Sequence, residues 1–168
     1  MDMHFKLGLY EHQSASAIGA IIKMLTQDPQ VLLSRTDSSN IEEVAIKIYE
    51  PAFGIIGDKA KREPTCRQSA DHSMVYIIGT LLRKAFEKRE KLLALQGDST
   101  MEVEIWKHLM LQPRDYTQAA IYNEETRAIM DKIVFEHGGD EYDELYPEGI
   151  PTSVMMKTKH KTVDSGIV

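Results

Sequence analysis

The spacing of apolar side chains divides the chain into helical and extended stretches. From Ser14 to Leu25 the apolar residues recur every three or four positions, which predicts a helix capped by Ser14 and ended by Asp28-Pro29. From Glu43 to Tyr49 apolar residues occupy every second position, so we expect a half-buried strand. We expect its buried face to carry Val44, Ile46 and Ile48, and its other face to carry Ala45, Lys47 and Tyr49.

A second long apolar stripe predicts a helix from Asp71 to about Leu95, with Asp71 as its N-cap. Its later turns, Arg83 to Lys91, are so rich in charge that we expect them to face solvent. Before it, Pro51, Gly54 and Gly57 are expected to interrupt regular structure. The other expected elements are a short helix at 101–111, a helix at 124–130 capped by Asn123, a strand at 132–136, an acidic loop at 138–149, and a hairpin of 153–158 with 162–168.

These elements predict an α+β fold with a small, mostly antiparallel sheet packed with helices. The 168 residues suit one domain, 1–168, with enough apolar content to form a core. Hydrophobic residues make up 42% and charged residues 27%, which is typical of a globular protein. The net charge of −6 argues against a nucleic-acid partner, because phosphate binding needs a basic face.

The chain contains no apolar run long enough to cross a membrane and no targeting sequence in its first residues. The only cysteine is Cys66, which excludes an intrachain disulfide and a thiolate cluster. Arg62 and Arg67 would depress the pKa of a nucleophilic Cys66 thiol, but a passive loop cysteine is the favoured interpretation. The six histidines lack metal-ligand spacing, so we expect no metal and no cofactor.

Positive charge gathers between the predicted strand and the second long helix. Because a helix N-terminus also attracts anions, the segment from this loop to Asp71-His72-Ser73 suits a carboxylate-rich small molecule. A solvated loop followed by an ordinary N-cap explains the same residues. Glu50 can act as an acid or base, or form an ion pair with Lys47 or Lys59. The cations of this loop are Lys59, Lys61, Arg62 and Arg67.

A second candidate site is formed by Lys6 and His12, which lie directly before the first helix. The helix dipole disfavours the charged form of His12, so its neutral ring can accept a proton. Lys6 can hold a substrate carboxylate or stabilise developing negative charge. The alternative is that both are ordinary surface residues.

Together these segments resemble the methylcitrate dehydratase (MmgE/PrpD) family, and most of all its eukaryotic, mitochondrial members. The residues that carry the resemblance are HFKLGLYEHQSASAI (4–18), IKIYEPAFGIIGD (46–58), RQSADHSMVYI (67–77), RAIMDKIVFEHGG (127–139) and YPEGIPTSV (146–154).

The resemblance implies the fold of the family's small lid domain, without the family's large all-helical domain and its catalytic residues. It implies dehydration of 2-methylcitrate to 2-methyl-cis-aconitate in propionate breakdown, without an iron–sulfur cluster and in mitochondria; otherwise a cytoplasmic location is expected. Lys6 and His12 match the family's opening lysine and histidine as catalytic residues. Arg67, Asp71, His72 and Ser73 match its second motif, which we assign to substrate binding or support of the site.

By this resemblance the chain alone is inactive, and its partners are a tricarboxylate substrate, the all-helical domain and, as is common in the family, a second copy. Two other functions remain open. One is a non-enzymatic domain that binds a tricarboxylate or a protein. The other is a relative of cis-aconitate decarboxylase, which shares the opening lysine and histidine but lacks a close match to YEPAFGIIGD (49–58).

Overall fold

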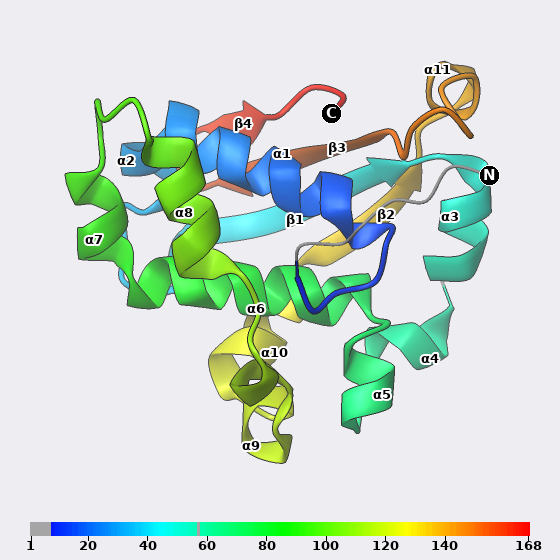
Figure 1. The fold of residues 1–168 in the computed structure, drawn as a ribbon, viewed down its shortest axis with the longest axis horizontal. Helices are drawn as coiled ribbons and strands as arrows, with labels where there is room; N and C mark the ends of the chain where they lie inside the picture. The colour runs from blue at the N-terminus through cyan, green and yellow to red at the C-terminus, as the bar shows by residue number, and fades with distance from the viewer. Residues whose placement is uncertain (1–7, 57) are drawn as a thin grey trace.

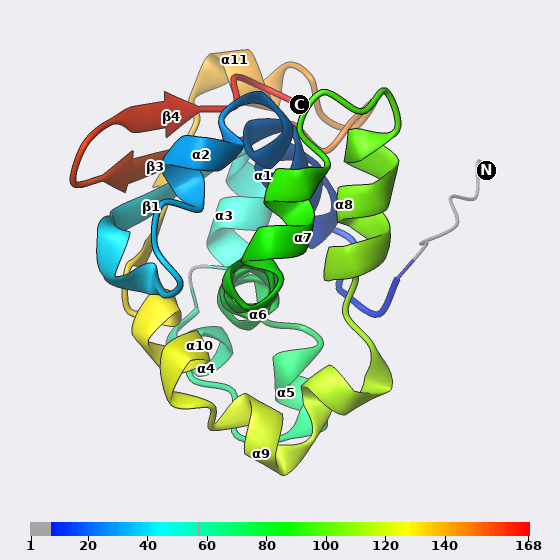
Figure 2. The same ribbon diagram turned by 90° about the vertical axis from the view of Figure 1, so that its left-hand side faces the viewer.

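A computed structural model describes residues 8–56 and 58–168 and confirms the α+β class. Figures 1 and 2 show the main helices gathered on one side of a single sheet. The helices are α1 (Ser14–Gln27), α2 (Pro29–Leu32), α3 (Glu50–Ile56), α4 (Lys59–Arg62), α5 (Arg67–Ala70), α6 (Met74–Glu87), α7 (Arg89–Ala94), α8 (Met101–Leu109), α9 (Gln118–Ile121), α10 (Glu124–Met130) and α11 (Asp140–Asp143), with 3-10 turns η1 (Ser38–Asn40) and η2 (Pro113–Tyr116).

The sheet is mixed rather than purely antiparallel. Its strands are β1 (Ile41–Ile48), β2 (Ile133–His137), β3 (Thr152–Thr158) and β4 (Thr162–Asp164), in the order β2-β1-β3-β4. The predicted hairpin is confirmed, because β3 and β4 pair antiparallel, as do β1 and β3. The pair β1–β2 is parallel, so its two carboxyl ends lie at the same edge of the sheet.

The core lies between the sheet and helices α1 and α6. The predicted inward face of β1 is confirmed, since Val44, Ile46 and Ile48 are all buried. Ala45, which was expected on the other face, is buried as well. Helix α1 packs against β3 and α8, and α10 packs against α6.

Several local predictions were wrong. Pro51 and Gly54 lie inside α3 rather than in a loop, and the basic loop contains the short helices α4 and α5. The predicted helix from Asp71 to Leu95 is two helices, α6 and α7, separated at Lys88. The acidic loop contains α11.

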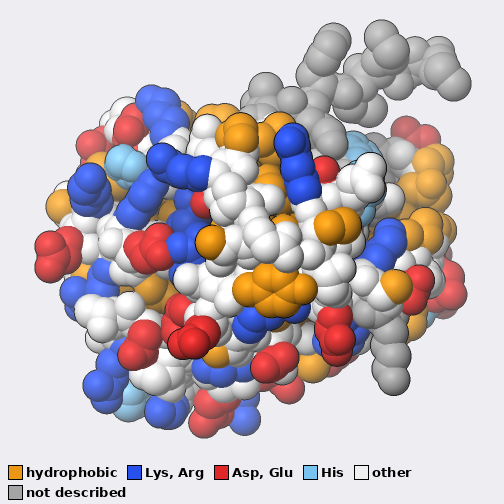
Figure 3. Space-filling model, turned by 90° about the horizontal axis from the view of Figure 1, so that it is seen from below, with side chains coloured by type: hydrophobic (Ala, Val, Ile, Leu, Met, Phe, Trp, Pro, Cys, Tyr) orange, Lys and Arg blue, Asp and Glu red, His pale blue; other side chains and the backbone are white. Residues whose placement is uncertain are grey.

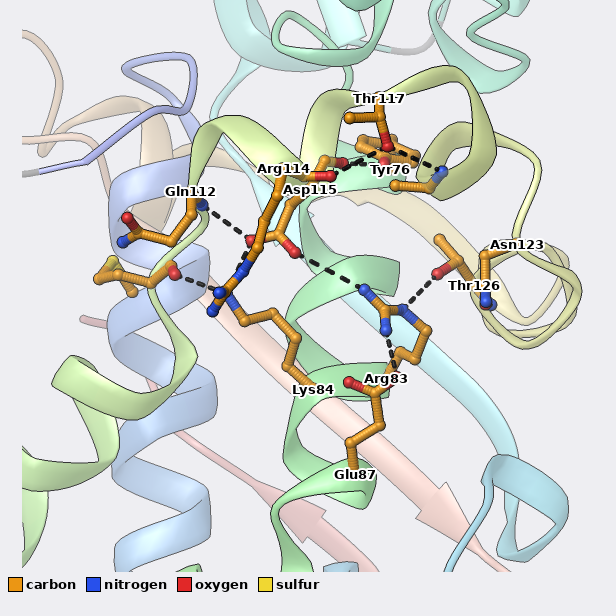
Figure 4. A network of polar contacts seen from close by, with 12 residues as sticks. Tyr76, Arg83, Lys84, Glu87, Gln112, Arg114, Asp115, Thr117, Asn123 and Thr126 are labelled. Atoms are coloured by element: carbon orange, nitrogen blue, oxygen red, sulfur yellow. Dashed lines mark hydrogen bonds and ion pairs between the residues drawn. The ribbon is translucent and has the colours of Figure 1, made fainter.

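The charged second half of α6 was predicted to face solvent, but its lysine is buried. Lys84 is only 3% exposed, because the segment that follows α8 folds over it. Its ammonium group donates to the carbonyl of Met110 at 2.6 Å and to Asp115 Oδ2 at 2.8 Å. The side chain of Arg83 donates to Thr126 Oγ1 at 2.9 Å (Figure 4). The prediction of a solvated stretch was therefore wrong for Arg83 and Lys84, whereas Glu87, Glu90 and Lys91 are exposed as expected.

Candidate functional site

Three separate segments meet near the carboxyl end of β1. They are the residues before α1, the residues before α6, and the loop that carries Tyr116. The hydroxyl of Tyr116 donates to the carbonyl of Leu9, which joins the first segment to the third. Asp71, from the second segment, is the charged group with the largest effect on the Tyr116 hydroxyl. The two sequence motifs around His12 and Asp71 thus lie in one neighbourhood.

Glu11 is a buried carboxylate in this neighbourhood. It is 7% exposed and accepts a hydrogen bond from Ser14 Oγ at 3.1 Å, at the first turn of α1. Its negative charge acts on Tyr49 at the end of β1 and on Tyr116. Glu11 is therefore the residue that links the strand end, the start of α1 and the Tyr116 loop.

Two buried tyrosines line the same neighbourhood. Burial raises the pKa of Tyr116, and the nearby Asp71, Tyr76, Asp115 and Glu11 raise it further. Burial also raises the pKa of Tyr49, whose ring stacks on Tyr146 with centroids 4.6 Å apart. Both hydroxyl groups therefore stay protonated at neutral pH and can donate hydrogen bonds.

Asp71 and His72 form an exposed pair. Nδ1 of His72 lies in contact with Asp71 Oδ1 and 3.2 Å from the carbonyl of Gln68, and both are acceptors. The neutral ring therefore carries its proton on Nδ1, which leaves Nε2 as the proton acceptor. Because 72% of the His72 side chain is exposed, a ligand can approach this ring.

Ser73, not Asp71, is the N-cap of α6. Its hydroxyl accepts from the backbone N–H of Tyr76 at 3.2 Å and donates to the carbonyl of Lys61. Asp71 instead follows the last turn of α5. Ser73 is fully buried, so its visible role is to fix the start of α6 and to tie it to α4.

The predicted cations have different environments. Arg67 is exposed, and its side chain makes no hydrogen bond or ion pair with the described residues. Arg62 donates to the carbonyl of Ile133 at 2.7 Å and lies over the ring of Phe135, so it anchors β2. Cys66 is exposed and its pKa is lowered by hydrogen bonds with Ser69, not by the arginines.

Of the two residues expected to be catalytic, Lys6 lies outside the described residues. His12 is exposed, one residue after the buried Glu11, and its carbonyl accepts from the backbone N–H of Ala15 in the first turn of α1. The prediction of a catalytic pair remains a prediction.

Glu50 lies at the same edge of the sheet in a second charged cluster. His137 Nε2 lies 2.9 Å from Asp143 and 3.6 Å from Glu50, while the expected partner Lys47 pairs with Glu136. Hydrogen bonds from the Glu50 backbone and from His137 lower the pKa of Asp143. This cluster joins α3, β2 and α11.

Sequence reasoning missed three residues of the site: Glu11, Tyr49 and Tyr116. Glu11 lies in the segment 4–18, next to His12, and Tyr49 lies in the segment 46–58, next to Glu50. Their position beside candidate residues is the feature of the sequence that could have identified them. Tyr116 lies in an aperiodic turn, and nothing local ties it to α1 or α6.

Over the residues with described structure, no group of three or more His, Cys, Asp or Glu side chains is arranged to hold a metal ion. None of the described helices is long and apolar enough to span a bilayer. A comparison with family models finds no match to the chain, and a comparison with curated proteins finds none either.

Proposed function

We propose that this chain forms the lid of a 2-methylcitrate dehydratase, one wall of a cleft that a helical domain completes. The observation that supports this proposal most is the proximity of the His12 and Asp71 motifs, which are far apart in the sequence. Tyr116 links them, because its hydroxyl donates to the carbonyl of Leu9 and the charge of Asp71 raises its pKa. The exposed imidazole and guanidinium groups of this neighbourhood suit a ligand with several carboxylates.

The elimination of water needs a base for a carbon-bound proton, an acid for the departing hydroxyl group, and cations for the carboxylates. In this proposal His12 transfers a proton and Lys6 stabilises negative charge. Arg67, which lacks a carboxylate partner among the described side chains, binds one substrate carboxylate. Asp71 fixes the ring of His72 so that Nε2 faces the ligand, and Ser73 supports both through its cap.

The test joins this chain to the helical domain of a methylcitrate dehydratase and follows the formation of 2-methyl-cis-aconitate by its conjugated double bond. We expect turnover by the joined protein and none above background by the chain alone, because positioning is lost without the second wall. In the joined protein, His12→Ala should lower kcat by about 100-fold or more.

The matched control is His160→Ala, since His160 is an exposed histidine in the turn between β3 and β4, remote from the site in sequence. Its turnover should stay within about twofold of the parent, because its ring makes no contact that the structure records. A folded joined protein without turnover would refute the proposal. Release of carbon dioxide from cis-aconitate would instead indicate the decarboxylase.

A further inference from the structure

A cationic cavity lies at the other end of α6, between α6, α8 and the segment that leads from α8 into η2. Its volume is about 440 Å³. Figure 3 shows Lys and Arg side chains clustered with a histidine at the upper left of the face seen from below. The charged and titratable residues that line the cavity are Lys84, Lys88, Lys107, His108 and Arg114.

The carboxylates around this cavity do not balance its cations. Asp115 pairs with Lys84 at 2.8 Å, and Glu104 pairs with Lys107 at 2.6 Å. Lys88 and Arg114 have no carboxylate within ion-pair distance in the described part of the chain. Among the described residues, the ammonium group of Lys88 donates to the carbonyl of His108. The positive charges of Lys88 and Arg114 are therefore available to a ligand.

The cations also crowd one another. Burial lowers the pKa of Lys88, and the positive charges of Lys84, Arg114 and Lys91 lower it further. In Figure 4 the side chain of Arg114 runs past Asp115 to the end of the Lys84 side chain, and the positive charge of Arg114 helps to lower the pKa of Lys84. Such an arrangement costs free energy without a counter-charge, and it occurs in a protein whose net charge is −6.

We propose that this cavity binds a small metabolite that carries phosphoryl groups, with Arg114 and Lys88 as its principal ligands. The donors come from three directions, namely α6, α8 and the segment before η2, where Gln112 adds a side-chain amide. A tetrahedral phosphoryl group presents oxygens to all three directions, whereas a carboxylate presents two oxygens in one plane.

The wall of the cavity is fixed before any ligand arrives. Lys84 is buried and held by Met110 and Asp115, and Asp115 also accepts from the backbone N–H of Gln112 at 2.8 Å. The chain around Arg114 is thus anchored on both sides, which limits the ordering cost of binding. Lys88 lies the whole length of α6 from Ser73, about 20 Å, while Arg114 shares the turn η2 with Tyr116 of the candidate catalytic neighbourhood.

The test is calorimetric titration of the 168-residue chain with inorganic pyrophosphate at low ionic strength. We expect saturable binding of one anion per chain. Arg114→Gln should weaken it by about tenfold, which corresponds to one charge-assisted contact. The side chain of Arg114 makes no hydrogen bond or ion pair to another described residue, so this variant should unfold at the parent's temperature.

Lys88→Gln is the second variant, and it should weaken pyrophosphate binding to a similar degree. The control is Lys157→Gln, which removes an exposed lysine of β3 paired with Glu42 and changes the net charge equally. Its affinity should stay within about twofold of the parent. Absence of saturable binding, or equal weakening by all three variants, would overturn the proposed site. Citrate that competes for it as strongly as pyrophosphate would overturn the phosphoryl assignment.

Discussion

Replacing Asp115 with asparagine should lower the free energy of unfolding by about 3–5 kcal/mol at pH 7, because it removes the one carboxylate that pairs with the buried Lys84 among the described residues. Asp115 is 5% exposed and lies 2.8 Å from the ammonium group of Lys84. Arg83 lies 3.7 Å from its other oxygen. Asparagine keeps the shape and one carbonyl oxygen, so the change removes charge rather than volume.

The upper limit of this loss follows from the proton equilibrium of Lys84. In the variant, the buried ammonium group of Lys84 has lost its carboxylate and can release its proton. The loss in the free energy of unfolding therefore cannot exceed the free energy of that deprotonation. A free lysine titrates near 10.5, so deprotonation at pH 7 costs about 1.4 kcal/mol per pH unit, or about 5 kcal/mol in all. Solvent exposure does not weaken this argument, because the Lys84 side chain is almost completely buried.

The loss should also depend on pH in a defined direction. Burial already lowers the pKa of Lys84 in the native protein, while Asp115 opposes that shift. Without Asp115 the folded-state pKa falls further, so between the folded-state pKa of the variant and that of the parent only the folded variant has released the Lys84 proton. Stability of the variant relative to the parent should therefore rise with pH, by up to about 1.4 kcal/mol per unit above neutrality.

Urea unfolding followed by circular dichroism at several pH values between neutrality and the lysine range measures both effects. Glu87→Gln is the control, since Glu87 is an exposed carboxylate that pairs with Arg83 one turn away. It should cost no more than about 0.5 kcal/mol. A loss below about 1 kcal/mol for Asp115→Asn, or a loss that does not change with pH, would show that Lys84 does not depend on Asp115.

Three further predictions concern two helix interiors and the cap of α6. Gly79→Ala should destabilise the protein by about 1–3 kcal/mol in urea unfolding, because the new Cβ would lie 2.9 Å from Met130 Cγ and 3.2 Å from the Thr126 carbonyl. Gly19→Ala in α1, where a Cβ meets nothing within 4 Å, should stabilise it by about 0.5–1 kcal/mol, and a loss there would contradict the packing described. Ser73→Ala should cost about 2 kcal/mol in the same assay, and an unchanged stability would contradict the role of this buried hydroxyl in fixing the start of α6.

The local elements of this fold could be predicted wherever a pattern depends on neighbouring residues. Asn123 caps α10 as expected, with its side chain accepting from the N–H of Thr126 at 2.9 Å. The strand β2 and the hairpin of β3 with β4 were also predicted. Each of these features follows from a helix cap, from the spacing of apolar residues or from a turn, all of which depend on residues close together in the sequence.

Features that depend on distant partners could not be predicted. The end of α6 near Lys88 and the burial of Lys84 depend on the segment after α8, which a helical pattern does not reveal. No pattern of neighbouring residues reveals the parallel pairing of β1 with β2. For the candidate site, the motif around Asp71 pointed to His72 and Arg67, but the link through Tyr116 depends on a contact between residues 9 and 116.

The position of β1 in the sheet has a consequence for biosynthesis. Val44 pairs with Ile133 on one side and with Met156 on the other, partners that are translated roughly ninety or more residues later. Until then this apolar strand emerges from the ribosome with both edges unpaired, which is a state prone to association with other chains. We therefore expect the nascent chain to require chaperones during its synthesis. Chains truncated before β3 should aggregate rather than fold, even though they contain most of the candidate site.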